Sequence, residues 1–268
     1  MTAPGSQLKN RLIVSAVLVS LCVYTILFAP AWFFFLAAEL FVLTGLNEYF
    51  VLAEKKGLAI NRFLGLGLGA LFPIACYFPS DSLVFVIACL SLFIFNFDRK
   101  RKEQALVNSA VTIFGLVYVA WFFSFLLKMR HLTDGGLWVF YTVLIVKLGD
   151  GAAYFWGKSF GRTKLIEHIS PNKSVEGAVA GFLTTVVTSA LSALYLPDAP
   201  IGQLLLLGIL VAFLAELGDL AESLIKRDVG VKDSGELPGL GGILDILDSL
   251  LLTIPFVYYY ITTIIGVY

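Results

Sequence analysis

The sequence predicts an all-α, polytopic integral membrane protein with about nine transmembrane helices and a cytoplasmic N-terminus. Its 268 residues are 59% hydrophobic and 14% charged, with a mean hydropathy of +0.89, whereas soluble domains carry about 25% charged residues. Apolar runs long enough to cross a bilayer, about 17–25 residues, recur along the whole chain. The loops between them differ in basic charge, which predicts the orientation.

The apolar runs follow one another with short polar connections. The first begins after Lys9 and Arg11 and is too long for the apolar core of a signal peptide. The third is rich in glycine and the fourth is short. The expected spans are residues 12–29, 31–52, 62–78, 82–97, 105–127, 135–156, 174–195, 201–225 and 243–265.

Basic residues support this count. With the N-terminus inside, the outside segments carry only Lys128 and Arg130, and Lys147 lies within the sixth span; the remaining Lys and Arg fall in inside segments. Cytoplasmic loops carry such an excess, so the C-terminus is expected outside. The net charge is zero, which gives no indication of a nucleic-acid partner.

The chain divides by content into two regions. Residues 1–130 are apolar with a few loop charges and are interpreted as a scaffold of about five helices. Residues 131–268, about four helices, hold nearly all the polar groups inside apolar runs. Ionisable residues there are costly and usually face a polar site, so the second region is predicted to be catalytic.

Acidic residues line one face of the eighth span. Their spacing of i, i+3, i+6 and i+7 places them on one helical stripe. These positions are the acidic Glu216, Asp219 and Glu222 and the hydroxyl-bearing Ser223, with Lys226 one step further. Asp245 and Asp248 are again i, i+3, at the start of the last span. Carboxylate oxygens suit Mg²⁺, so two such pairs on neighbouring helices could hold one or two ions.

Two other observations bear on a metal. His131 and His168 fall on opposite sides of the predicted membrane, so a metal site must rest on carboxylates. The alternative is that the acids only pair with Lys226, Arg227 and Lys147.

The connection between the acidic helices suggests an anion site. Residues 238–242 read Pro-Gly-Leu-Gly-Gly, and glycines let backbone N–H groups approach an anion. Lys226, Arg227 and Lys232 add positive charge beside it. Together they favour a phosphate-rich ligand; a plain turn is the alternative for the glycines alone.

A second polar cluster surrounds the sixth span. Asp150 and Tyr154 are i, i+4, and the glycines that follow are expected to break the helix. Ser174 is a candidate cap for the seventh helix, with Glu176 in its first turn. Lys147 is the alternative partner that would make Asp150 structural. Glu48, in the second span near its cytoplasmic end, could line the same cavity or simply sit near the membrane interface, and the second interpretation is preferred.

These residues resemble the phosphatidate cytidylyltransferases, or CDP-diacylglycerol synthases. The resemblance covers residues 146–250 in detail. The first matching motif comprises Gly218, Asp219, Leu220, Ser223, Lys226, Arg227, Lys232, Asp233, Gly235, Leu237, Pro238, Gly239, Gly241, Gly242, Asp245 and Asp248. The second comprises Asp150, Tyr154, Gly157, Gly161, Arg162, Ser170, Pro171, Lys173, Ser174, Glu176 and Gly177.

Three positions depart from the family pattern. Leu240 stands where the pattern has histidine, Ile246 where it has arginine, and Lys147 where it has tryptophan. The first two changes remove a proton carrier or phosphate contact and a permanent positive charge. Because such a loss costs about 10²–10³ in rate, they predict an impaired enzyme, or an inactive relative or variant that still binds lipid or nucleotide.

The resemblance implies that CTP and phosphatidic acid react to CDP-diacylglycerol and pyrophosphate. The lipid phosphate attacks the α-phosphorus of CTP, with Mg²⁺ and a second metal ion at Asp219, Asp245 and Asp248. Lys226 is expected at the catalytic centre, on the triphosphate. The resemblance assigns substrate contacts to Ser223, Arg227, Lys232, Asp233, Gly241, Gly242, Asp150, Tyr154, Arg162, Lys173, Ser174 and Glu176.

The resemblance also implies a homodimer, in contact through residues 1–130, in the inner (cytoplasmic) membrane, with the active site facing the cytoplasm. A CTP-dependent polyprenol kinase and a cation transporter are the other function classes. Product analysis would separate the kinase, and cation flux without nucleotide would indicate the transporter.

Overall fold

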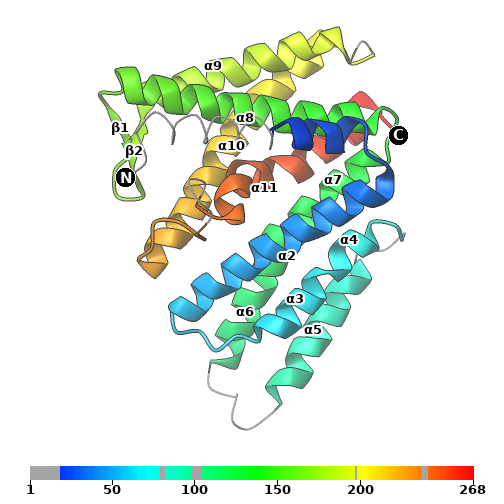
Figure 1. The fold of residues 1–268 in the computed structure, drawn as a ribbon, viewed down its shortest axis with the longest axis vertical. Coiled ribbons are helices and arrows are strands. Elements are labelled where there is room, and N and C mark those ends of the chain that lie inside the picture. Colours follow the sequence, from blue (N-terminus) through cyan, green and yellow to red (C-terminus); the bar gives the residue numbers. More distant parts are fainter. Residues whose placement is uncertain (1–18, 79–81, 98–103, 197, 237–240) are drawn as a thin grey trace, which may run out of the picture.

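The computed structural model describes residues 19–78, 82–97, 104–196, 198–236 and 241–268, and these are almost entirely helical (Figure 1). Residues 19–27 are α-helical and precede α2. The helices are α2 (Ala31–Lys55), α3 (Arg62–Gly69), α4 (Leu71–Ala75), α5 (Ser82–Asn96), α6 (Ala105–Gly115), α7 (Phe122–Arg130), α8 (Gly135–Phe160), α9 (Val175–Leu191), α10 (Ile201–Val229) and α11 (Ile243–Tyr260). A π-helical turn, η2 (Leu116–Trp121), joins α6 to α7; η3 (Ser192–Leu194) and η4 (Ile261–Ile265) extend α9 and α11.

Six of the described helices are long and apolar enough to cross a membrane. They cover Ala31–Lys55, Ala105–Arg130, Gly135–Phe160, Val175–Leu194, Ile201–Val229 and Ile243–Ile265. The prediction of a polytopic membrane protein is therefore supported, and six of the nine expected spans have a matching helix.

The other three expected spans are not confirmed. The run at 62–78 forms two short helices, α3 and α4, because Pro73 and the glycines weaken a continuous helix. The run at 82–97 forms α5, which at 15 residues is short for a crossing. Most of the run at 12–29 lies outside the described residues.

The described residues are all-α apart from one short hairpin, which was not expected. Strands β1 (Lys164–Ile166) and β2 (Ser170–Ser174) form an antiparallel hairpin, with Lys164 opposite Ser174. Of the glycines expected to break the preceding helix, Gly157 does not do so, whereas Gly161 does: α8 runs through Gly157 and ends at Phe160, and the backbone of Gly161 is extended. A helix tolerates single glycines at about 1 kcal/mol each.

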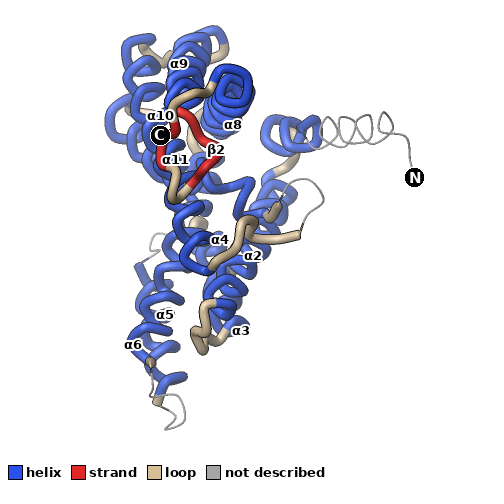
Figure 2. The backbone as a smooth tube through the Cα atoms, turned by 90° about the vertical axis from the view of Figure 1, so that its left-hand side faces the viewer, coloured by secondary structure: helices blue, strands red, loops and turns tan. Residues whose placement is uncertain are grey.

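The helices pack as a chain of neighbours around α11. Helix α8 packs along α9, α9 along α10, and α10 along α11, and α11 also contacts α2 and α7. In Figures 1 and 2, α8 and α9 lie at one end of the molecule, and α3, α5 and α6 at the other. Small residues bring α8 and α9 close, since a Cβ on Gly181 would lie 3.0 Å from that of Ala153.

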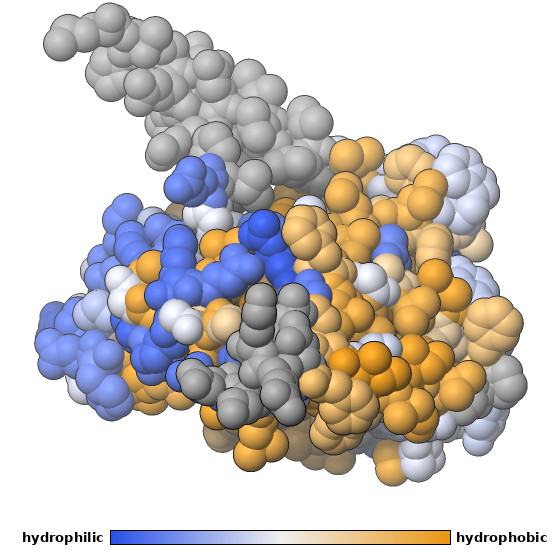
Figure 3. Space-filling model, turned by 90° about the horizontal axis from the view of Figure 1, so that it is seen from below, coloured by the Kyte–Doolittle hydropathy of each residue, from blue (hydrophilic) through white to orange (hydrophobic). Residues whose placement is uncertain are grey.

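Polar side chains collect at one side of this bundle. Figure 3 shows hydrophilic residues gathered on the side where Figure 1 places β1, β2 and the C-terminal end of α10. The other side of that face is mostly hydrophobic. The polar side therefore carries the hairpin, which belongs to the second motif, and the C-terminal end of α10, which belongs to the first.

Candidate active site

Lys173 joins the two polar clusters of the sequence. It lies in β2, and its Nζ is 2.6 Å from Oε1 of Glu216 and 3.0 Å from Oδ2 of Asp219 on α10. Burial lowers the pKa of Lys173, but the two carboxylates outweigh it and hold the pKa above its ordinary value. The lysine therefore stays charged, and the hairpin is held against the acidic stripe of α10.

Lys226 joins α10 to α11. Its ammonium forms ion pairs with Glu222, one turn earlier, and with Asp245 at the start of α11. Lys226 is 7% exposed and Glu222 is fully buried. A buried charge is tolerated only when paired, so these three groups depend on one another.

Asp245 closes the loop that precedes α11. Its Oδ2 accepts hydrogen bonds from the backbone N–H of Ser234 at 2.8 Å, the Ser234 hydroxyl at 2.8 Å and the N–H of Gly242 at 2.6 Å. Gly241 has φ +79°, and a Cβ there would lie 2.6 Å from the same oxygen, so glycine is required. The N–H of Gly242 thus serves a carboxylate of the protein itself, and is not open to a phosphate.

Glu48 of α2 holds the same helix start and is a contact that sequence reasoning missed. Its oxygens accept the N–H groups of Ile243 at 2.9 Å and Leu244 at 2.8 Å, and the Ser234 hydroxyl at 2.9 Å. The preferred interpretation, that Glu48 simply sits near the interface, was therefore wrong. A carboxylate in an apolar run was itself a signal, but nothing local in the sequence pairs it with residues nearly 200 positions away.

We expect Glu48→Gln to destabilise the protein by about 1.5–3 kcal/mol, because hydrogen bonds to a charged acceptor are lost and an NH₂ group faces N–H donors. Thermal unfolding in detergent checks this. The matched control is Glu39→Gln on the same helix, since Oε2 of Glu39 has no hydrogen-bond partner among the described residues. Equal unfolding midpoints for the two variants would contradict the anchoring role of Glu48.

Lys147, Asp150 and Ser249 link α8 to α11. Lys147 Nζ lies 2.9 Å from Oδ2 of Asp150 and 3.0 Å from Oγ of Ser249, which donates to the same aspartate oxygen at 2.7 Å. The expected alternative for Asp150, an ion pair with Lys147, is thus what the structure contains. Asp150 carries the same charge as Asp248 of α11, and the two carboxylates repel each other.

Asp219 and Asp248 lie on α10 and α11, which pack against each other, and the two carboxylates interact electrostatically. A Cβ on Gly218 would lie 2.5 Å from the carbonyl oxygen of Asp248, so the helices approach closely beside both carboxylates. Asp248 is 9% exposed, and its Oδ1 accepts the N–H of Ser249 at 2.6 Å. Ser223 donates to Oδ1 of Asp219 at 3.4 Å.

The expected Mg²⁺ ligands do not form a complete cage. Among the described residues there is no group of three or more His, Cys, Asp or Glu side chains placed to hold a metal. Each oxygen of Asp245 already has a protein donor. Both oxygens of Asp219 also have donors, Ser223 and Lys173. Because Mg²⁺ is commonly held by one or two carboxylates plus substrate phosphates, a site at Asp219 and Asp248 requires Lys173 to turn from Asp219 to a phosphate, and a site at Asp245 requires the same of Lys226.

The hairpin residues have structural partners that orient Arg162. Ser174 caps α9 as predicted, accepting the N–H of Gly177 at 3.2 Å. Glu176 accepts the N–H groups of Arg162 at 3.1 Å and Thr163 at 3.2 Å. The backbone at Arg162 is therefore fixed while its exposed side chain projects from the polar side.

The remaining expected site residues lie at the periphery. Arg227 donates to the carbonyl oxygens of Ile169 at 3.1 Å and Val231 at 2.9 Å, which ties the hairpin loop to the end of α10. Lys232 and Asp233 are exposed. Tyr154 is 61% exposed, beneath the Lys158 ammonium, and within the described part of the chain no hydrogen bond joins it to the carboxylates. Leu240 lies outside the described residues.

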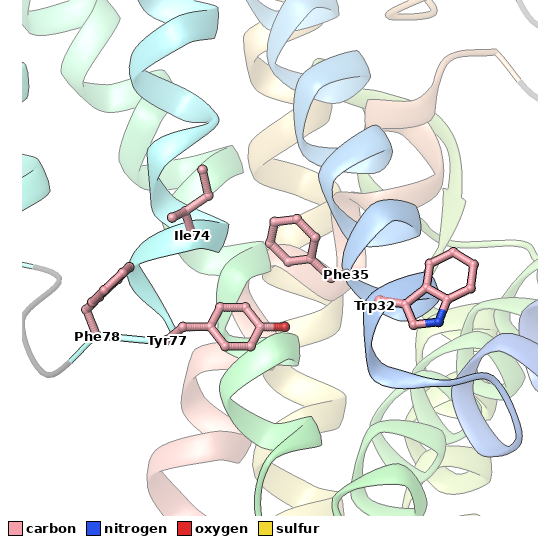
Figure 4. A pocket seen from close by; sticks show the side chains of 5 residues that line it. All are labelled: Trp32, Phe35, Ile74, Tyr77 and Phe78. Carbon is pink, nitrogen blue, oxygen red and sulfur yellow. The ribbon is translucent and has the colours of Figure 1, made fainter.

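Two hollows differ in chemistry. A small cavity of about 30 Å³ between α8, α9 and α10 is lined by Asp150, Glu216 and small or apolar side chains. A larger one of about 320 Å³ is entirely apolar or aromatic (Figure 4), lined by Trp32, Phe35, Ile74, Tyr77 and Phe78. It lies at the N-terminal end of α2, about 20 Å along that helix from Glu48 at 1.5 Å per residue. The larger hollow is therefore separate from the charged cluster.

Known proteins are similar to this chain over nearly its whole length. The model of the cytidylyltransferase family matches residues 9–264. A phosphatidate cytidylyltransferase of Synechocystis sp. is 33% identical over 291 residues, covering 97% of this chain and 99% of the relative. Phosphatidate cytidylyltransferase 4, chloroplastic, of Arabidopsis thaliana is 31% identical over 98% of this chain and 76% of the relative. The Bacillus subtilis phosphatidate cytidylyltransferase is 42% identical over 53% of this chain and 54% of the relative.

Proposed function

The chain belongs to the cytidylyltransferase family of CTP-dependent nucleotidyltransferases, and we propose that it converts CTP and phosphatidic acid to CDP-diacylglycerol and pyrophosphate. The observation that carries this is a pair of ammonium groups, that of Lys226 buried and that of Lys173 partly buried, each held by two carboxylates. Lys173 meets Glu216 and Asp219, and Lys226 meets Glu222 and Asp245. Phosphate groups can replace these carboxylates as partners of the two lysines.

The reaction joins two anions, so it needs positioning and charge neutralisation more than a strong base. Lys226, Arg227 and Lys232, at the end of α10, bind the triphosphate. Lys173 and Arg162, from the hairpin side, bind the phosphate of the lipid. The oxygen of that phosphate attacks the α-phosphorus, the bond to the bridging oxygen breaks, and pyrophosphate leaves with the electron pair.

Asp219 and Asp248 are the residues that would hold Mg²⁺ together with substrate phosphates, where its charge stabilises the anionic groups. Asp245 is the third expected ligand. It would bind the metal ion only in a state in which Lys226 has moved from Asp245 to a phosphate. In the described arrangement, Asp245 positions Lys226 and the start of α11.

The assay that tests this function follows labelled CTP into lipid with the purified chain, phosphatidic acid and Mg²⁺. We expect labelled CDP-diacylglycerol that requires Mg²⁺ and phosphatidic acid. The double variant Leu240→His/Ile246→Arg is expected to be faster, since a missing phosphate contact costs about 10²–10³ in rate. Label in neither protein, with both folded, would contradict the proposed function.

The surroundings of the site extend the proposal. CTP is a cytoplasmic substrate, so we place the polar side in the cytoplasm and the protein in the inner membrane. Residues 1–130 act as scaffold, as Glu48 on the start of α11 illustrates, and provide the contact of a homodimer. Recovery of monomer alone after crosslinking in membranes would contradict the dimer.

A further inference from the structure

Lys147 carries a positive charge near the middle of a membrane helix, and the proposed reaction does not use it. The helix is α8 (Gly135–Phe160), which is long and apolar enough to cross a membrane. A charged side chain inside such a helix is costly and usually belongs to a substrate or ion site. The presence of this lysine therefore requires an explanation beyond its ion pair with Asp150.

The ammonium group of Lys147 reaches α11 at the residue that follows Asp248. Its Nζ is 3.0 Å from Oγ of Ser249, and the backbone N–H of Ser249 binds Oδ1 of Asp248 at 2.6 Å. The same Nζ is 2.9 Å from Asp150, whose side chain lines the small cavity between α8, α9 and α10. The ammonium therefore lies at the corner where α8 meets the carboxylates proposed to hold Mg²⁺.

The charges at this corner are not enclosed by the protein. The side chains of Lys147 and Asp150 are 35% and 37% exposed, and that of Asp219 is 31% exposed. Within a membrane-spanning helix, such open charges face water or an ionic ligand, because contact with lipid is strongly unfavourable. We therefore expect the corner to be hydrated and open to a charged substrate.

Lys147 also has a donor to spare. An ammonium group carries three N–H donors, and its hydrogen-bond partners among the described residues are two, Asp150 and Ser249. A phosphate oxygen can accept the third donor without breaking either contact. Lys147 differs in this from Lys173 and Lys226, which have to leave a carboxylate before they bind a phosphate.

The sequence shows a matching exchange of charge. Residues 147 and 246 depart from the family pattern in opposite senses, since lysine replaces tryptophan at the first and isoleucine replaces arginine at the second. Residue 246 precedes Ser249 by three positions on α11, and the Cβ atoms of such pairs are about 5–6 Å apart. The Lys147 ammonium is thus at most about 10 Å from Cβ of residue 246. One positive charge is missing on α11, and another enters the same junction from α8.

We propose that Lys147 is a further substrate-binding residue of this chain, which donates its third N–H to a phosphate group of CTP or phosphatidic acid and replaces the positive charge that position 246 lacks. This inference rests on the proposed function and adds a residue to its site. The faster rate expected of the double variant Leu240→His/Ile246→Arg is then due mainly to the change at position 240.

The test begins with Lys147→Met, in which methionine fills much of the space of the lysine stem. Its kcat/KM is expected to fall by about 10²–10³. The KM for CTP and the KM for phosphatidic acid are measured separately, and the one that rises identifies the substrate whose phosphate is bound. Lys147→Arg keeps the charge and is expected to keep most of the activity. Unchanged kcat and KM values in Lys147→Met overturn the proposal.

A double-mutant cycle with Ile246→Arg tests the exchange of charge. In the Lys147→Met background, Ile246→Arg is expected to restore most of the lost rate, because it returns a positive charge to the same corner. In the unaltered chain the same change is expected to add little, because Lys147 already supplies that charge. Independent, additive effects of the two changes would overturn the proposal.

Ser249→Ala separates substrate binding from simple support of the helices. It removes the hydroxyl that links Lys147 and Asp150 to α11 but keeps both charges, so it is expected to lower the unfolding temperature more than the activity. An activity loss as large as that of Lys147→Met would show a structural role and overturn the proposal. If the unaltered chain and Lys147→Met form product equally well, this inference fails alone. If the unaltered chain forms no product, the proposed function fails and this inference fails with it.

Discussion

Replacement of Lys226 by methionine is expected to abolish cytidylyl transfer and to destabilise the protein by about 3–5 kcal/mol, the cost of removing one partner of a buried ion pair. Methionine fills much of the space of the lysine stem but leaves Glu222, which is fully buried, and Asp245 without their shared cation. On the proposed function the same change also removes a contact with the triphosphate, worth about 10²–10³ in rate. Thermal unfolding and activity per folded molecule check the two effects separately.

Lys56→Met is the matched control for this experiment. Lys56 also pairs with a carboxylate, Asp228, at 2.8 Å, but both side chains are largely exposed, at 45% and 66%. Exposed ion pairs contribute about 0–1 kcal/mol, so the control is expected to keep both stability and activity. Similar behaviour of the two variants would show that the ion pairs of Lys226 matter no more than a surface contact.

The helices that carry the site were predictable because their signals are local. Apolar length indicated α8, α10 and α11, and the i, i+3 spacing placed Glu216 and Asp219 on one face of α10. Both carboxylates do meet Lys173. The hairpin β1–β2 was not predicted, because its eight residues are mostly polar and have no alternating apolar pattern.

The contacts that close the site were harder to predict because they are long-range. Glu48 binds the N–H groups of Ile243 and Leu244, and no periodicity connects such distant positions. The role of Asp245 had a local signal. An acidic side chain at the third position of a helix commonly accepts the backbone N–H of the residue that caps the start of that helix. It does so here with Gly242, which removes that N–H from the expected phosphate cradle.

Replacement of Asp219 by asparagine is expected to lower the rate of CDP-diacylglycerol formation by about 10²–10³ or more. The variant would hold Mg²⁺ less well, so the negative charge that develops on the phosphates would be less well neutralised. The amide keeps the size of the side chain and can still accept the Lys173 ammonium, so the fold is expected to persist. The Mg²⁺ concentration needed for half-maximal rate is also expected to rise, because an amide is a weaker ligand for this ion than a carboxylate. A titration of activity with Mg²⁺ measures both effects.

Glu216→Gln separates this role from simple support of Lys173. The same ammonium lies closer to Glu216, at 2.6 Å, than to Asp219, at 3.0 Å. If Asp219 only held Lys173, the Glu216 variant would lose at least as much activity, and neither would change the Mg²⁺ requirement. We expect instead that Glu216→Gln keeps the Mg²⁺ requirement of the unaltered chain and loses less activity. Equal losses in the two variants, with unchanged Mg²⁺ dependence, would remove Asp219 from the proposed metal site.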